Sequence, residues 1–136
     1  MSGALPVPAP AVFPETAPFW EATARGKLLL SRCEDCGAVI WYPRPLCPAC
    51  GRPRVSWVEA SGRGSVYSFT VVHRNAVDGY REAVPYVVAY VELEEGPRVL
   101  TNIVGCDPEA VTIGMPVSAT FDDTGHGSAL FRFRPA

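Results

Sequence analysis

Four of the five cysteines lie in two C-x-x-C pairs, and these pairs carry the clearest chemistry in the sequence. The pairs are Cys33 with Cys36 and Cys47 with Cys50. A glycine follows each pair and permits the tight turn in which backbone amides point toward the sulfurs. Two such turns that face each other would place four sulfurs tetrahedrally, which suits Zn²⁺. We therefore predict a structural zinc site formed by these four cysteines.

The loop between the two cysteine pairs is short, with ten residues between Cys36 and Cys47. A tight hairpin through "AVIWYPRPL" would close this gap, although the spacing is shorter than in many zinc sites. Iron in the same sulfur cage is the main chemical alternative, because the four cysteines do not select the metal by themselves. Disulfides are disfavoured because the N-terminus has no export signal. Catalysis at the metal is disfavoured because four sulfurs leave no open coordination position.

No further residues form a recognisable catalytic motif in the sequence. His73 and His126 are the only histidines, and neither lies beside a serine or cysteine in a nucleophile motif. Asp122 and Asp123 lie in a polar loop, where we expect both carboxylates to stay solvated and ionised. We interpret "GRG" at residues 62–64 as a turn and Cys106 as a small, at least half-buried residue. The sequence assigns no catalytic residue and predicts little turnover by the isolated chain.

The charge of the chain argues against nucleic acid as its main partner. The 136 residues carry a formal net charge of −2, whereas nucleic-acid-binding domains are usually basic. Residues 25–54 hold six Lys or Arg and two acidic residues, a charge of +4, so the rest carries −6. A single-strand binder with Tyr67, Phe69, Tyr86 and Tyr90 as stacking platforms is an alternative, but these aromatics lie in the acidic part. With no membrane-spanning stretch, we expect a cytoplasmic protein.

The elements that would position these residues are a short helix and a series of short strands. "PETAPFWEATARGKL" predicts a helix in which Thr16 can cap, Pro18 suits the first turn and Gly26 can end it. Runs such as "GSVYSFTVVHR" and "PYVVAYVEL" predict strands with one buried face. In the second run, Val87, Ala89, Val91 and Leu93 share a face. In the first run, the residues expected to share a face are Tyr67, Phe69, Val71 and His73.

Five or six strands in the second part of the chain are too few for a sandwich but sufficient for a small OB-type barrel. The predicted fold is therefore mainly β, with an N-terminal helix and a zinc ribbon followed by an OB-fold barrel. We divide the chain into a flexible leader (residues 1–12), the helix and ribbon (residues 13–54) and the barrel (residues 55–136). The Pro- and Ala-rich composition of residues 1–12 is typical of a flexible leader.

The order of these motifs resembles a known family. From Phe13 to the C-terminus, "FWEATARGKLLLSRCEDCG", "PRPLCPACG", "GRGSVYSFTVVHR" and "VPYVVAYVELEEGPRVLTNIVGC" are similar to acyl-CoA-associated proteins that join a helix and a rubredoxin-like zinc ribbon to an OB fold. The resemblance implies a non-catalytic accessory subunit in a hetero-oligomer. The implied partner is a thiolase-superfamily enzyme or a hot-dog-fold acyl-CoA hydratase. The implied reactions are acyl transfer, thiolase-type condensation and retro-aldol cleavage, including that of steroid side-chain CoA thioesters.

The residues best suited to contact such a partner are Trp20, Trp41 and Tyr42, because Trp and Tyr are enriched at interface hot spots. The same side chains are equally able to fill the gap between ribbon and barrel. The basic ribbon would lie near the CoA phosphates, with Arg25, Lys27, Arg32 or Arg44 as clamps, although the partner would bind most of the CoA thioester. A stand-alone acyl-CoA-binding or channelling protein is the alternative function.

Overall fold

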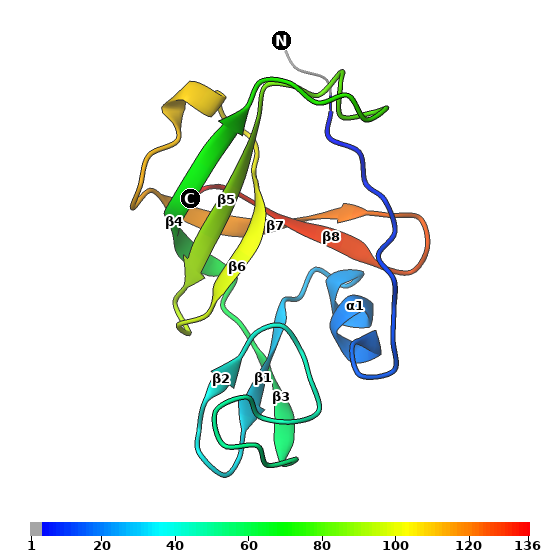
Figure 1. Ribbon diagram of the computed structural model, residues 1–136, viewed down its shortest axis with the longest axis vertical. Helices are drawn as coiled ribbons and strands as arrows, with labels where there is room; N and C mark the ends of the chain where they lie inside the picture. The colour runs from blue at the N-terminus through cyan, green and yellow to red at the C-terminus, as the bar shows by residue number, and fades with distance from the viewer. Residues whose placement is uncertain (1–3) are drawn as a thin grey trace.

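The computed structural model describes residues 4–136 and places a small ribbon module below a barrel (Figure 1). Helix α1 (Ala17–Thr23) lies beside the ribbon and against the last barrel strand. Thr16 occupies the N-cap position, but its hydroxyl bonds the backbone of Phe13 and makes no capping bond to the helix. Gly26, with φ of +73°, follows the helix and reverses the chain direction. The predicted helix is therefore present, but packing of its side chains holds it in place, and the expected side-chain cap at Thr16 does not form.

The ribbon is a three-stranded antiparallel sheet in the order β2-β1-β3. Its strands are β1 (Leu29–Cys33), β2 (Val39–Ile40) and β3 (Val55–Glu59). A small core of Cys33, Ile40 and Cys47 lies between the two cysteine turns. Only residues 60–62 separate β3 from the first barrel strand, so the ribbon sheet leads almost directly into the barrel.

The barrel is closed by five strands in the order β4-β5-β6-β8-β7, as the OB-type prediction requires. They are β4 (Arg63–Val72), β5 (Tyr86–Leu93), β6 (Arg98–Ile103), β7 (Pro116–Asp123) and β8 (Ala129–Pro135), with a short 3-10 helix η1 (Pro108–Ala110) after β6. Neighbouring strands are antiparallel except β6 and β8, which meet in parallel through the single pair Ile103 and Phe133. The barrel is therefore most weakly paired between β6 and β8.

The predicted alternation is confirmed in β5 but breaks in β4. Val87, Ala89, Val91 and Leu93 are all buried, as expected. In β4 the register shifts between Val66 and Ser68, and a bulge of this kind turns side chains to the opposite face. Tyr67 is consequently exposed, while the partly buried Phe69 and Val71 pack against the core. The expectation that Tyr67 shares their face was wrong because alternation cannot reveal an inserted residue.

One hydrophobic core runs through both modules. It joins Phe19 and Trp20 of α1 and Leu30 of β1 to barrel residues such as Val66 and Phe133. Thr23 links α1 to the barrel by hydrogen bonds. Its buried hydroxyl donates to the Trp20 carbonyl (2.6 Å) and accepts from the Ala129 amide of β8 (3.0 Å). Helix, ribbon and barrel are thus packed as one body. Among the described residues, no helix is long and apolar enough to cross a membrane.

The N-terminal segment, residues 4–12, forms neither helix nor strand and runs along the barrel (Figure 1). The Arg132 guanidinium donates to the Pro6 carbonyl, and the Pro6 ring lies close to Gly79 of the β4–β5 loop. Residues 1–3 of the predicted flexible leader lie outside the described residues. The described part of that leader thus lies in contact with the barrel.

Candidate metal centre and the aromatic cluster beside it

The four cysteines of the two pairs converge at one point of the ribbon. Cys33 and Cys50 have their sulfurs 3.6 Å apart, as do Cys36 and Cys47. All four Sγ atoms lie within 4.8 Å of one another. A tetrahedron with Zn–S bonds of about 2.3 Å has sulfur–sulfur edges of about 3.8 Å. The spacing therefore fits a metal held by four sulfurs, and Cys106 lies outside this group.

Two similar backbone turns create this arrangement. Gly37 donates its amide to the Cys33 carbonyl (2.9 Å), and Gly51 donates to the Cys47 carbonyl (2.7 Å). Both glycines have positive φ, +77° and +78°, a conformation that residues with a side chain rarely adopt. The Cys36 amide also points toward the Cys33 sulfur at 3.5 Å. The glycine after each pair therefore has the role that the sequence predicted.

The protonation of the four thiols is uneven. The Cys36 amide lowers the pKa of Cys33, and the Cys50 amide lowers the pKa of Cys47 to about 7. At Cys50 the Arg52 amide also lowers the pKa, but burial and the neighbouring thiols outweigh it and raise the pKa to about 12. Thiolates this close repel one another, and a divalent cation among them would favour the ionised form of all four.

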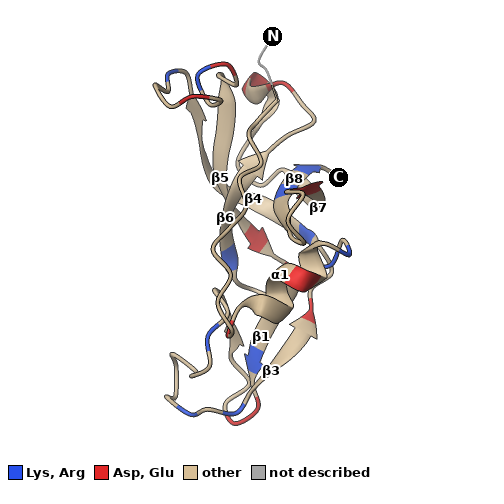
Figure 2. Cartoon of the chain, turned by 90° about the vertical axis from the view of Figure 1, so that its right-hand side faces the viewer, with Lys and Arg blue, Asp and Glu red and all other residues tan. Residues whose placement is uncertain are grey.

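The basic residues of the ribbon divide into paired and unpaired groups. Arg54 lies 3.0 Å from Asp35 and 3.4 Å from Glu34, and Lys27 lies 3.5 Å from Glu59. Exposed pairs of this kind contribute little stability. Within residues 4–136, no ion pair involves the remaining cations proposed as phosphate clamps, which are Arg25, Arg32 and Arg44. Figure 2 shows basic residues on β1 and on several ribbon loops.

Trp20, Trp41 and Tyr42 come together next to the ribbon as part of one aromatic cluster. Trp20 donates its indole N–H to the Tyr42 hydroxyl at 2.9 Å. Phe19 packs edge-on against all three rings, with centroids 4.9 to 5.8 Å apart. Phe131 of β8 lies 5.6 Å from Trp41, so the cluster joins ribbon to barrel. Trp20 is only 7% exposed, while Trp41 and Tyr42 are half-buried.

The two histidines, the "GRG" segment and the tyrosines of the nucleic-acid alternative lie in different parts of the structure. His73 begins the β4–β5 loop and His126 lies in the β7–β8 turn, both exposed. Of "GRG", only Gly62 lies in the bend before β4, while Arg63 and Gly64 are the first residues of the strand and Arg63 bonds Glu94 at 2.9 Å. Of the tyrosines considered as stacking platforms for nucleic acid, Tyr67 and Tyr90 are exposed on the outer face of the barrel. Arg98 already stacks on the Tyr67 ring at 3.8 Å.

Sequence reasoning missed Arg132, which is only 5% exposed. Its guanidinium donates to Asp122 at 2.7 Å, so Asp122 is not the free solvated carboxylate that was expected. The alternating "FRFR" of β8 predicts an outward, solvated arginine. Arg132 does point outward, but the N-terminal segment covers it, and no local sequence signal reports such a long-range contact.

The fold and the sulfur site together define a class of protein, a rubredoxin-like zinc ribbon joined to an OB-fold barrel. Residues 20–56 match the family model of the ChsH2 rubredoxin-like zinc ribbon domain, and residues 57–122 match that of the ChsH2 C-terminal OB-fold domain. The chain belongs to this family, which also includes the DUF35 domain-containing scaffold proteins.

Curated relatives differ in length and in name. A DUF35 domain-containing scaffold protein of Methanocaldococcus jannaschii is 41% identical over 76% of this chain and 78% of its own. A probable enoyl-CoA hydratase alpha subunit of Thermomonospora curvata is 40% identical over 95% of this chain, but the chain spans only 40% of that relative's length. The benzoylsuccinyl-CoA thiolase subunit BbsA of Geobacter metallireducens is 33% identical over 61% of this chain and 59% of its own.

A solved structure, that of an Ltp2-ChsH2(DUF35) aldolase, matches nearly the whole chain. The matching chain has a TM-score of 0.83 and 39% identity. The alignment covers 93% of this chain and 98% of the other. The architecture of ribbon, helix and barrel is therefore shared with a ChsH2-type chain over almost its full length.

Proposed function

We propose that this chain is a non-catalytic subunit of a CoA-thioester enzyme complex, with a thiolase-superfamily enzyme as its partner. The observation that carries the proposal is the likeness to a chain of an Ltp2-ChsH2(DUF35) aldolase over 98% of that chain. Relatives named as subunits of a hydratase and of a thiolase support a role inside a CoA-dependent complex. The partner reaction that we favour is formation or cleavage of a carbon–carbon bond next to a thioester.

We further propose that Cys33, Cys36, Cys47 and Cys50 hold one structural zinc ion. The support is the sulfur cage, whose contacts of 3.6 Å suit the radius of a tetrahedral Zn²⁺ site. Bound zinc would supply the positive charge that lets four adjacent thiolates coexist. Because four sulfurs complete the coordination sphere, the site stabilises the ribbon and takes no part in the reaction.

The partner surface that we propose lies at the ribbon end of the aromatic cluster. Trp41 and Tyr42 are half-buried, so each keeps a surface for a second protein, while Trp20 contributes by holding the Tyr42 hydroxyl. Arg25, Arg32 and Arg44 are exposed around the same module. Such cations would steer the chain toward an acidic enzyme surface or toward the CoA phosphates.

The decisive experiment is co-purification of this chain with the products of its neighbouring genes, followed by reconstitution with the enzyme subunit that this identifies. The chain should co-purify with a thiolase-superfamily protein, and turnover of an acyl-CoA substrate should require both. The chain alone should show little turnover because its residues supply no nucleophile with a base. An enzyme subunit that is fully active alone and forms no complex with this chain would contradict the proposal, as would turnover by the lone chain that His73→Ala abolishes.

A further inference from the structure

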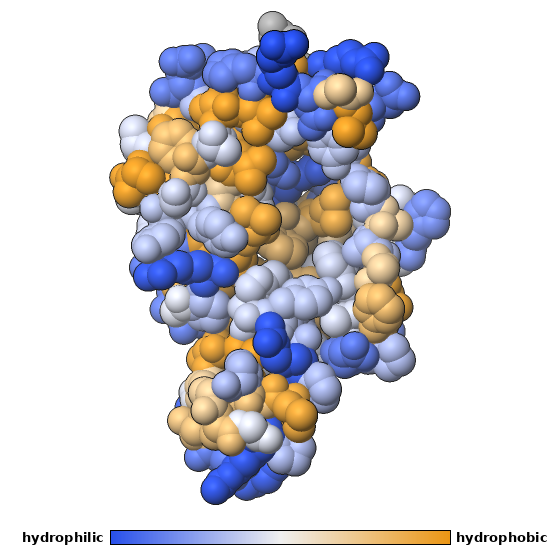
Figure 3. All heavy atoms as spheres, viewed as in Figure 1, coloured by the Kyte–Doolittle hydropathy of each residue, from blue (hydrophilic) through white to orange (hydrophobic). Residues whose placement is uncertain are grey.

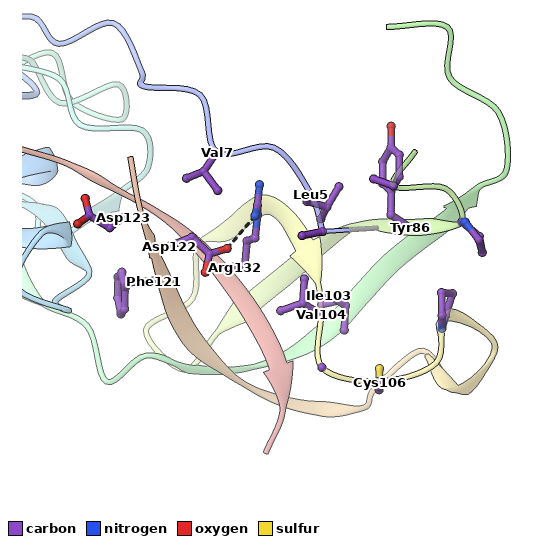
Figure 4. A pocket seen from close by; sticks show the side chains of 15 residues that line it. Leu5, Val7, Tyr86, Ile103, Val104, Cys106, Phe121, Asp122, Asp123 and Arg132 are labelled. Atoms are coloured by element: carbon purple, nitrogen blue, oxygen red, sulfur yellow. Dashed lines mark hydrogen bonds and ion pairs between the residues drawn. The ribbon is translucent and has the colours of Figure 1, made fainter. Parts of the chain in front are cut away.

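A cavity of about 610 Å³ lies where the N-terminal segment crosses the barrel (Figure 4). The space-filling view in Figure 3 shows this face of the molecule hollowed beside the barrel. Its apolar walls are formed by Leu5, Val7, Tyr86, Ile103, Val104 and Phe121. The volume falls within the range of about 300–1,000 Å³ that is typical of small-molecule sites.

The barrel topology explains why the cavity forms at this place. β6 and β8 pair through one residue pair, Ile103 and Phe133, and the Val104 amide donates to the Phe133 carbonyl at 2.8 Å. Beyond Val104 the chain leaves β8 and continues toward η1. Val104, just after the end of β6, is only partly buried, and its side chain lines the cavity. The N-terminal segment lies opposite Val104, so the cavity has a barrel wall and a wall contributed by residues distant in sequence.

The charges that line the cavity disfavour an anionic ligand. Among residues 4–136, Arg132 is the only cation that lines the cavity, and it already donates to Asp122 at 2.7 Å and to the Pro6 carbonyl. Asp123 follows Asp122 on β7 and its side chain points to the other side of the strand (Figure 4), so the charges of the described residues that face the cavity are those of the Arg132–Asp122 pair, which cancel. An apolar site with compensated charge and an arginine N–H fork suits a neutral group that carries a carbonyl oxygen.

We propose that this cavity binds the neutral acyl portion of a thioester, with the N-terminal segment forming one wall of the site. The choice of a thioester rests on the proposed function in a CoA-thioester complex. The apolar chain of the ligand would lie between Val104 and the residues Leu5 and Val7. The carbonyl oxygen would accept a hydrogen bond from one of the five Arg132 N–H groups that neither Asp122 nor the Pro6 carbonyl accepts from.

The N-terminal segment is shaped to act as this wall. In an extended chain, Leu5 and Val7 share one side, and both line the cavity. Pro6 between them is held by its carbonyl at Arg132. A Cβ atom at Gly79 would lie 3.0 Å from the Pro6 ring, so Gly79 allows the segment to approach closely. Ligand binding should therefore depend on the segment being in place.

The test uses the purified chain alone and decanoyl-N-acetylcysteamine, a neutral thioester without the CoA nucleotide. Calorimetric titration should show saturable binding, and Val104→Trp should weaken it at least about tenfold by filling the cavity. Leu100→Trp, which changes an apolar residue exposed on the outer face of β6, is the matched control and should bind as wild type. If Val104→Trp fails to fold, Leu5→Ser with Val7→Ser provides the same test from the opposite wall.

Charge preference gives a second and independent readout. Decanoate should bind at least about tenfold more weakly than the neutral thioester, because Asp122 already pairs with the Arg132 guanidinium and a second carboxylate would have no cation to balance it. Asp122→Asn removes the charge that balances Arg132 but retains an oxygen that can accept from its guanidinium, so this variant should narrow the difference in affinity between the two probes. Equal affinity for both probes, or no effect of the wall variants, would overturn the proposal.

Cys106 lines the cavity and reports its occupancy. Burial and nearby Asp107 raise the pKa of Cys106, so its alkylation by N-ethylmaleimide should be slow, and the thioester should slow it further. Peptide mapping distinguishes Cys106 from the ribbon cysteines. Unchanged alkylation at saturating thioester would contradict binding at this cavity. Because these measurements need no partner, their failure would leave reconstitution of the enzyme complex as a separate test of the subunit function.

Discussion

Replacing Thr23 by valine should loosen the joint between helix and barrel. The substitution preserves the shape of a side chain that is 1% exposed but removes the hydroxyl that accepts from the Ala129 amide at 3.0 Å. The Trp20 carbonyl keeps the Ala24 amide as a donor at 3.3 Å, so the Ala129 N–H is the group left unsatisfied. A buried unsatisfied donor costs about 1–3 kcal/mol. The midpoint of thermal unfolding should fall by roughly 4 °C for each kcal/mol.

The assay can separate the two modules because all three tryptophans lie in α1 and the ribbon: Trp20, Trp41 and Trp57. Urea unfolding followed by tryptophan fluorescence reports that half, and far-ultraviolet circular dichroism is dominated by the barrel strands. The two transitions should coincide in wild type, because one core runs through both modules. They should move apart in Thr23→Val.

Thr23→Ser is the matched control, since it keeps the hydroxyl and removes only a methyl group. Hydrogen exchange at the Ala129 amide should stay slow in Thr23→Ser and become faster in Thr23→Val. The reasoning is refuted if Thr23→Val is no less stable than Thr23→Ser and its Ala129 amide exchanges as slowly as in wild type. That result would mean that packing alone fixes α1 against β8.

Three further predictions concern the metal, the partner and pH. Wild type should contain about one zinc per chain, whereas Cys47→Ser should lose zinc and most of the stability of the ribbon. Absence of metal, or a Cys33–Cys36 disulfide in freshly reduced protein, would contradict the assignment. In calorimetric titration, Trp41→Ala should weaken partner binding by about 2 kcal/mol, roughly thirtyfold in the dissociation constant, while its zinc content stays that of wild type. Wild-type affinity in this variant would place the interface elsewhere. Arg63 hydrogen-bonds Glu94 and lowers the pKa of that carboxyl group, so the pair stabilises the fold at pH values above the pKa of unfolded Glu94, and this contribution is lost as the pH falls through the folded pKa. Carboxyl NMR titration should show a higher Glu94 pKa in Arg63→Ala than in wild type. An unchanged pKa would refute the coupling.

Local patterns in the sequence were sufficient for the sulfur cage and most of the strands. The C-x-x-C-G repeat fixes two identical turns within a few residues, so its geometry follows from nearby residues alone. The alternation of Val87, Ala89, Val91 and Leu93 likewise depends only on one regular strand. The OB-type barrel followed from the number and spacing of such strands, and five of them close the barrel.

The features that sequence reasoning missed depend on contacts between distant residues. The bulge at Tyr67 occurs because two β4 residues meet one position of β5, which a single strand cannot reveal. Arg132 is buried, and its guanidinium contacts the carbonyl of Pro6, 126 residues earlier in the chain. The sequence left two roles open for Trp41, contact with a partner and packing between ribbon and barrel. Its contact with Phe131 depends on where β8 lies relative to the ribbon, which the local sequence does not reveal.

The short link between β3 and β4 has a mechanical consequence. Residues 60–62 leave little length for a hinge, and the core and Thr23 hold the modules together on the other side. A rigid body of this kind would hold a molecule bound at the ribbon and a molecule bound at the barrel at a fixed distance and angle. When one end is bound, the other is presented at a high effective concentration to a single location. Two sites on a large assembly could thereby be held at a set separation without a flexible tether.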